Sequence, residues 1–326
     1  MKISLFGMSY YNYTKSIKYA LEALGHEVLM VIDDDLGFRS KNIVANKLRM
    51  INFQPDLFIN FCGNYRYNLI DADFLNKITG KKILMYADAI KFVGNVEQNI
   101  SLYDKVCLFE ETDVKYIKSK YGVNCDVISG SVAEEIFCLG FPNQKRVYDL
   151  SFVGVMLQER LDFFEKIAQY AIDKKLNMIV YGNFWKKKHW WQELWYKRKF
   201  FMKYPNLAHF AVNDYIQPEQ ASLLYRKTKI CLNKHIDRHK SVNYRVFEIM
   251  ANNNFELCDS REQANEFGLK DSENIAFYED VEDCIKKIEY YLINEEIRQK
   301  IAEAGGELVR KKFTTKAVME RLLTSL

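Results

Sequence analysis

Short apolar runs alternate with longer segments of helical periodicity along the chain. An apolar run covers residues 2–6, a segment with helical spacing covers 14–24, and a second apolar run covers 27–32. Gly25 stands between that helix and that strand, where a left-handed cap is favoured. Further apolar runs follow at 57–62, 82–87, 106–109 and 125–128. This rhythm predicts an α/β fold with parallel sheets.

The rhythm fades over residues 129–148, where Gly130, Gly140 and Pro142 mark a linker, and then starts again. The renewed elements are expected at 150–153, 160–174, 178–181, 230–232 and 255–258. Since single cores stop growing near ~250 to 300 residues, a chain of 326 residues suits two domains. We predict domains at 1–145 and 146–312, followed by a C-terminal segment at 313–326.

Glycines at two places qualify this prediction. Gly7 ends the first strand but is followed by Met8 and not by a glycine-rich turn, which disfavours a dinucleotide-dependent dehydrogenase. The helix expected at 295–312 contains Gly305 and Gly306. We therefore predict that this helix bends or ends there.

The stretch 230–259 carries the most chemistry. An apolar strand leads into a polar loop, a helix opens near Ser241 to Asn243, and a second apolar strand follows. In an open α/β sheet, ligands bind beyond the carboxyl ends of the strands, where a helix N-terminus attracts phosphate. Arg245 and Glu248 lie three positions apart on this helix and so share a face. A cation and a carboxylate there suit a diphosphate and a sugar hydroxyl.

The pattern N-x-R-x-F-E, formed by Asn243, Arg245, Phe247 and Glu248, resembles the donor-site segment of group 1 glycosyltransferases. The run from Asp149 through Gly154, with Arg160 behind it, is similar to a D-x-S-F-x-G strand of their CgeB-like branch. The resemblance is strong over the C-terminal half. It implies the GT-B arrangement, in which two Rossmann-like domains face each other across a cleft and the final helix returns to the first domain.

This resemblance implies a metal-independent transfer of a sugar, with hexosyl transfer expected, from a nucleotide diphosphate sugar to a glycan, lipid-linked or protein acceptor. Arg245 would stabilise the departing diphosphate and Glu248 would bind the ribose. Many relatives carry an earlier Glu where Lys240 stands here, so retention or inversion stays open. The residues expected to bind the donor are Gly154, Arg160, Tyr181, Gly182, Asn233, Lys234, Lys240, Ser241, Val242, Asn243, Tyr244, Arg245 and Glu248.

Catalytic chemistry from the N-terminal domain is harder to locate. Asp88 ends a predicted strand and is our leading candidate for a general base, with Glu110 behind it. Both carboxylates could instead cap strand ends. Gly7, Ser9, Tyr10 and Asp88 are expected on the acceptor side.

Several residues have a plain alternative. Arg245 and Glu248 could form a surface ion pair, Lys234 and Lys240 could be solvated, and Arg160 could be exposed. His235, Asp237 and His239 alternate as metal ligands do, but the lysines and arginine between them would repel a cation. We therefore predict no metal and no cofactor beyond the nucleotide diphosphate sugar as co-substrate.

An aromatic and basic segment at 183–204 stands apart. Trp190, Trp191, Leu194 and Trp195 fall on one helical face, flanked by lysines at 186–188, 197 and 199. Core packing under an insertion is the favoured interpretation. Peripheral contact with a membrane or a lipid-linked acceptor ranks second, and nucleic acid binding is not expected.

Composition narrows the class without deciding it. A formal net charge of +4 favours anionic ligands without requiring nucleic acid. Seven scattered cysteines indicate free thiols in a reducing cytoplasm, and the start of the chain has no signal-peptide or membrane-spanning pattern. We expect a cytoplasmic protein, with possible contact at the inner face of the membrane. A non-catalytic nucleotide-sugar or polyanion binding module remains the alternative.

Overall fold

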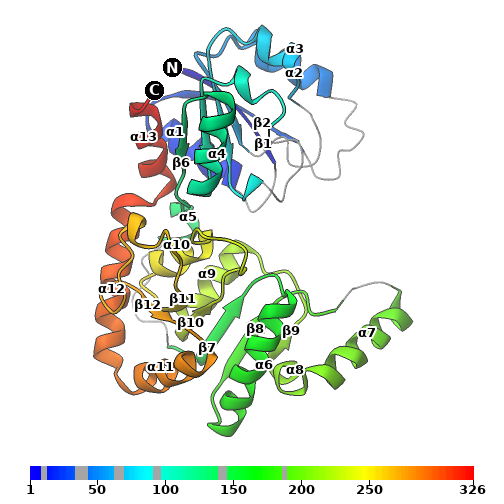
Figure 1. Cartoon of the computed structure of the whole chain (residues 1–326), viewed down its shortest axis with the longest axis vertical. Helices are drawn as coiled ribbons and strands as arrows, with labels where there is room; N and C mark the ends of the chain where they lie inside the picture. Colours follow the sequence, from blue (N-terminus) through cyan, green and yellow to red (C-terminus); the bar gives the residue numbers. More distant parts are fainter. Residues whose placement is uncertain (9–12, 34–42, 62–69, 91–96, 139–144, 186–188) are drawn as a thin grey trace. The chain divides into compact units, whose positions relative to one another are not determined.

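The computed structural model describes the chain except for residues 9–12, 34–42, 62–69, 91–96, 139–144 and 186–188. The described residues form two compact units, Met1–Ala133 with Lys312–Leu326, and Glu134–Lys311. Each unit holds a parallel sheet of six described strands flanked by helices (Figure 1). The predicted α/β class with two Rossmann-like domains is confirmed.

The first unit has the strand order β2-β1-β3-β4-β5-β6. Its strands are β1 (Lys2–Met8), β2 (Glu27–Asp33), β3 (Leu57–Phe61), β4 (Lys81–Tyr86), β5 (Lys105–Leu108) and β6 (Cys125–Val127). Its helices are α1 (Tyr13–Ala23), α2 (Ile43–Asn52), α3 (Ala72–Lys77), η3 (Ile100–Leu102), α4 (Glu111–Tyr121) and α13 (Thr315–Thr324). Val318 and Met319 of α13 pack in one apolar cluster with Ile3 and Leu5 of β1. Helix α13 and strand β1 therefore contribute to the same hydrophobic core.

The second unit has the strand order β12-β11-β10-β7-β8-β9. Its strands are β7 (Tyr148–Val153), β8 (Met178–Tyr181), β9 (Ala211–Val212), β10 (Thr228–Asn233), β11 (Glu256–Asp259) and β12 (Ala276–Tyr278). Its helices are α5 (Glu134–Phe137), α6 (Gln158–Asp173), α7 (Trp190–Lys203), α8 (Pro205–Phe210), α9 (Pro218–Arg226), α10 (Tyr244–Ala251), η4 (Asn265–Phe267), α11 (Val281–Ile293) and α12 (Glu295–Lys312).

Strand order in the second sheet reverses between β7 and β10. From β7 the chain adds β8 and β9 on one side, and it then crosses back to add β10, β11 and β12 on the other. Where the order reverses, the two following connections leave in opposite directions and open a crevice beyond the carboxyl ends of the strands. The loops after β7 and β10 therefore border the position where this fold takes a ligand.

The break between the two units falls after Ala133, inside the stretch expected to be a linker. That stretch also contains α5, and the carbonyl oxygen of Ile136 in this helix accepts a hydrogen bond of 2.9 Å from Ser222 Oγ. Helix α12 does not end at Gly305 and Gly306. A Cβ atom at position 305 would lie 2.5 Å from the carbonyl oxygen of Asn274. Gly305 allows a close approach of backbone to the helix and Gly306 a close approach of the Asn253 side chain, and the helix continues past both.

Candidate functional site

The loop after β10 and the start of α10 lie at the reversal point of the second sheet. Asn233 is the last residue of β10, and Asn243 is the N-cap of α10. The Asn243 side chain accepts a hydrogen bond of 3.3 Å from the backbone N–H of Val246. This cap satisfies one of the helix's otherwise unpaired donors and fixes where the helix begins.

Asn233 hydrogen-bonds to Asn243 and Arg245 and so connects the end of β10 with the start of α10. We call the region around these three residues the corner. The Asn233 side chain is fully buried, and its Nδ2 donates to Asn243 Oδ1 at 3.1 Å and to Glu256 Oε1 at 2.8 Å. Its Oδ1 accepts from Asn243 Nδ2 at 3.1 Å and from Arg245 Nη1 at 3.4 Å. A buried side chain with this many partners holds Arg245 in one orientation.

Arg245 and Arg160 both lie over the ring of Phe152. Their guanidinium carbons are 5.5 and 5.6 Å from the ring centroid, which is cation–π distance. Gly154 adjoins this stack, because a Cβ atom there would lie 2.8 Å from Phe152 Cζ and 3.2 Å from Arg245 Nη2. Any larger residue at position 154 would collide with the groups that position Arg245.

Arg160 is buried and hydrogen-bonded to backbone carbonyl groups. The alternative that this arginine is merely exposed at the surface is therefore wrong. Arg160 Nε donates to the carbonyl oxygen of Lys234 at 2.8 Å, its Nη2 contacts the same oxygen, and its Nη1 donates to Val155 O at 2.7 Å. Burial, and next the charge of Arg245, lower the pKa of Arg160 to about 10. It remains charged at neutral pH and ties the loop after β7 to the loop after β10.

Glu256 is a site residue that sequence reasoning missed. It is 1% exposed, and burial raises its pKa to about 8 although Asn233 and Arg245 act in the opposite direction. Its Oε2 has no hydrogen-bond partner among the described residues. The same holds for two more buried atoms of this corner, Ser241 Oγ and Arg245 Nε. The available signal was a glutamate inside a run that otherwise reads as a buried strand.

His235, Cys258 and Asp259 form a second buried group at the end of β11. Asp259 Oδ1 accepts from the backbone N–H of His235 at 2.7 Å and lies 2.8 Å from His235 Nδ1. Burial would raise the pKa of Asp259, but His235 and Arg261 together hold it below its usual value. Burial lowers the pKa of His235, so that its ring is neutral at pH 7.

Potential metal-ligating atoms of these three residues lie within 4.8 Å of one another. The residues around them do not suit a cation. Asp259 Oδ2 contacts Arg261 Nη2 and lies 3.4 Å from Lys234 Nζ, so its charge is already matched by two cations. A metal ion would have to displace these ion pairs and overcome the repulsion of both side chains.

The other predicted donor-site residues lie at the same two loops, on α10 or at the end of β8. Glu248 and Tyr244 are half-buried on α10, and Val242 is buried at its start. Lys240 is exposed and lies 3.1 Å from Glu262 Oε2. At the end of β8, Tyr181 is half-buried and Gly182 is buried, with a hypothetical Cβ 2.8 Å from Gly154 O.

The predicted acceptor-side residues belong to the first unit. Asp88 follows β4, is half-buried, and its Oδ1 accepts a hydrogen bond of 2.8 Å from the N–H of Ala89. Gly7 lies in β1 next to Thr14, whose Oγ1 would be 2.5 Å from a Cβ atom at that position. Ser9 and Tyr10 lie outside the described residues. Glu110 is buried as the N-cap residue of α4.

Helix α7 contradicts the favoured interpretation of its tryptophans. Trp190 is 75% exposed, Trp191 58% and Trp195 57%, so these side chains are not buried in a core. Among the described residues, none of the helices combines the length and the apolar composition that crossing a bilayer requires.

Comparisons with known proteins place these observations in context. A family model described as "Glycosyl transferase-like" matches residues 160–324. HepE from Anabaena, solved with UDP and glucose, is similar in fold with a TM-score of 0.68 at 10% identity, covering 100% of both chains. Sucrose-phosphate synthase from Thermosynechococcus elongatus is similar with a TM-score of 0.66 at 12% identity, covering 100% of this chain and 98% of that one.

The same fold also occurs in another enzyme class. A putative UDP-N-acetylglucosamine 2-epimerase from Listeria monocytogenes is similar with a TM-score of 0.57 at 13% identity, covering 100% of this chain and 96% of that one. No curated protein matches this chain in sequence. At such low identity the structural likeness concerns the fold alone.

Proposed function

The chain belongs to the glycosyl transferase-like family, and we propose that it moves a sugar from a nucleotide diphosphate donor bound at the start of α10. Membership confirms the resemblance to glycosyltransferases, and the assignment to the CgeB-like branch stays a prediction. The chain is thus a glycosyltransferase. Which hexose it transfers, and to what acceptor, belongs to the proposal.

One observation carries the proposal. At the reversal point of the second sheet, a capped helix N-terminus and the cation of Arg245 occur together. The partial positive charge of the helix favours a diphosphate beside Asn243. The hydrogen bond of Arg245 to Asn233 and its position over the Phe152 ring mean that its charge needs no reorganisation when negative charge develops on the leaving group. Glu248, one turn further along, would accept hydrogen bonds from the ribose hydroxyls.

In the proposed reaction an acceptor oxygen forms a bond to the anomeric carbon of the sugar. The bond from that carbon to the diphosphate breaks, and its electron pair leaves with the nucleotide. Arg245 and the α10 N-terminus stabilise this departing charge, so a metal ion is not needed for that task. If configuration inverts, Asp88 takes the acceptor's proton. The acceptor would be a glycan, a lipid-linked saccharide or a protein. We place the enzyme in the cytoplasm, with access to the inner face of the membrane.

Titration calorimetry with UDP, GDP and dTDP, with and without EDTA, tests the donor site. We expect one nucleotide to bind in the presence of EDTA and Arg245→Ala to weaken that binding. Nucleotide binding that survives Arg245→Ala and Glu248→Ala unchanged would contradict this site.

A transfer assay with acceptor mixtures then separates an enzyme from a binding module. Asp88→Asn should abolish transfer while nucleotide affinity is preserved. Undiminished turnover would reject Asp88 as the base. Binding without transfer or donor hydrolysis under any condition would favour a non-catalytic nucleotide-sugar module.

A further inference from the structure

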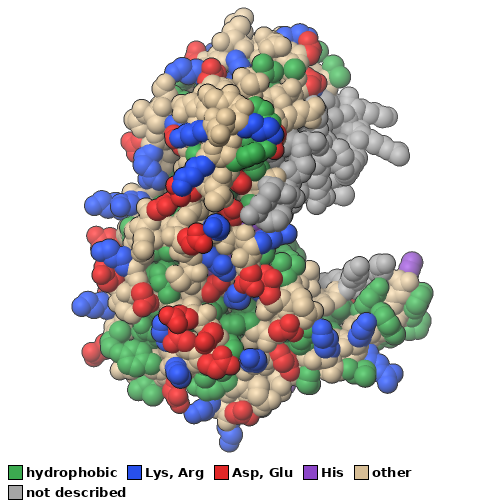
Figure 2. All heavy atoms as spheres, viewed as in Figure 1, with side chains coloured by type: hydrophobic (Ala, Val, Ile, Leu, Met, Phe, Trp, Pro, Cys, Tyr) green, Lys and Arg blue, Asp and Glu red, His purple; other side chains and the backbone are tan. Residues whose placement is uncertain are grey.

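Helix α7 exposes an apolar face that the described residues of the second unit do not cover. Trp190, Trp191, Leu194, Trp195 and Met202 are each more than half exposed. Their spacing places them on one side of the helix, since positions three, four and seven apart share a face. Figure 2 shows hydrophobic side chains gathered along α7 with Lys and Arg side chains among them. Exposed apolar surface of this extent marks an interaction site.

The opposite side of α7 is fixed to the fold. Phe200 is buried, with ring centroids 5.1 Å from Phe184 and 5.5 Å from Trp185. Behind it, the Tyr204 hydroxyl lies 3.0 Å from Asp162 Oδ1 of α6. The C-terminal part of α7 is therefore anchored, and the rest of the helix extends away from the sheet of its unit (Figure 1).

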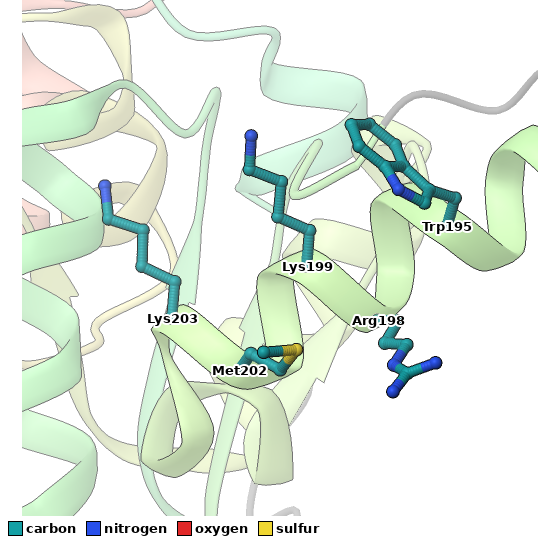
Figure 3. Close-up of a pocket in the computed structure, with 5 residues that line it drawn as sticks. All are labelled: Trp195, Arg198, Lys199, Met202 and Lys203. Atoms are coloured by element: carbon teal, nitrogen blue, oxygen red, sulfur yellow. The ribbon is translucent and has the colours of Figure 1, made fainter.

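Cations border this apolar face on both sides. Lys199 and Lys203 follow Trp195 at successive steps of four positions and run along one edge, as Figure 3 shows. The Lys199 ammonium lies 5.4 Å from the centroid of the Trp195 ring. Lys197 stands on the other edge, 5.6 Å from the Phe201 ring centroid. The single acid of α7, Glu193, lies 3.4 Å from Trp185 Nε1.

We propose that this face of α7 lies on an anionic phospholipid surface, with Trp190, Trp191, Leu194 and Trp195 in the acyl boundary. Lysines at the edges of an apolar face are placed to meet lipid phosphates while their stems follow the apolar surface. Arg198, near the middle of the face, has a long enough side chain to reach the headgroups in the same way. Tryptophan suits this depth because its ring is apolar and its N–H is polar.

Other occupants fit these residues less well. A second copy docked face to face would place the bordering lysines of one helix near those of the other. Single-stranded nucleic acid needs flat rings for stacking along a basic groove. Here the exposed face also contains the aliphatic Leu194 and Met202, and the cations lie mainly at its edges.

Vesicle flotation of the full chain tests the proposal. The protein should float with phosphatidylcholine vesicles that contain phosphatidylglycerol and should float far less with phosphatidylcholine alone. Trp190→Ala with Trp195→Ala should lower the partition coefficient at least about tenfold. Lys199→Gln with Lys203→Gln should lower it about fivefold per lysine at low salt. The matched control, Tyr290→Ala with Lys286→Gln on α11, should bind as the unaltered chain does.

A second readout guards against misfolded variants. Tryptophan emission should be quenched by lipids brominated in their acyl chains, and circular dichroism of each variant should match that of the unaltered chain. Absence of flotation for the folded, unaltered chain overturns the proposal. So does a concentration-dependent dimer, or RNA binding, that the tryptophan substitutions abolish while vesicle binding is absent.

Discussion

The corner at the start of α10 and the face of α7 depart from ordinary protein surfaces in opposite directions. The corner buries polar atoms that have no hydrogen-bond partner in the described part of the chain, among them Glu256 Oε2 and Ser241 Oγ. Helix α7 exposes tryptophans that would normally be covered. Each arrangement costs free energy in the isolated chain, because buried polar groups lose water and exposed apolar groups order it. Departures of this kind concentrate at functional sites. Buried polar atoms indicate a polar ligand, and exposed apolar side chains indicate an apolar partner surface.

The two regions also differ in what holds them. The corner is supported from several strands and helices, so that one changed residue disturbs several contacts. The exposed half of α7 is supported by its own hydrogen bonds, and its side chains contribute little to the stability of the fold. Substitutions should therefore separate the two regions: at the corner they should change chemistry and pH dependence, and on α7 they should change partner binding alone.

The largest expected effect is at Arg245. Arg245→Ala should lower kcat roughly 10²- to 10³-fold, as removal of one preorganised charge-stabilising group does, and Arg245→Lys should recover part of that loss. The measurement is steady-state transfer with the donor that calorimetry identifies. Arg310→Ala is a matched control, since Arg310 is hydrogen-bonded to Asn253 Oδ1 on the surface. Equal kcat in Arg245→Ala and the control would remove Arg245 from the mechanism.

The next effect is on the pH dependence of stability. Because the pKa of Glu256 in the folded chain is raised to about 8 from 4.5, the native state binds a proton that the unfolded state has lost. The free energy of unfolding should then fall as pH rises toward 8, by up to about 1.4 kcal/mol per pH unit. Glu256→Gln keeps the acceptor for Asn233 and should flatten this fall.

Urea unfolding between pH 7 and 8 is the suitable measurement. Below pH 6.5 the lowered pKa of His235 acts with the opposite sign, because protonation then favours the unfolded chain. An identical slope for Glu256→Gln and the unaltered chain would show that Glu256 is ionised in the fold.

The smallest effect is expected on α7. Trp190→Ala should change the free energy of unfolding by no more than about 0.5 kcal/mol, as exposed substitutions usually do. Phe200→Ala, on the buried side of the same helix, should cost about 3 kcal/mol or more. Urea unfolding at fixed pH compares the two. A large loss for Trp190→Ala would mean that its ring packs in the folded chain, and the contrast between the two regions would disappear.

Much of the architecture could be predicted from local patterns. The strands predicted at 2–6, 178–181 and 230–232 correspond to β1, β8 and β10. Short apolar runs between segments of helical periodicity are typical of buried strands, and this pattern is local. Asn243 was recognisable as the start of a helix, since a cap acts within three residues. Helix α5 and the passage of α12 through its glycines were not predictable in this way, because contacts with distant residues stabilise both.

The sequence by itself determined the succession of elements and the charged pair Arg245 and Glu248 on one helix, because both depend on spacing along a few turns. Only the tertiary structure decided which strands become neighbours, and hence that Arg160 and Arg245 both lie over the ring of Phe152. It also decided that Glu256 is buried and that Trp190 is exposed. Burial is set by what packs against a side chain from elsewhere in the chain, and spacing along one segment carries no information about that.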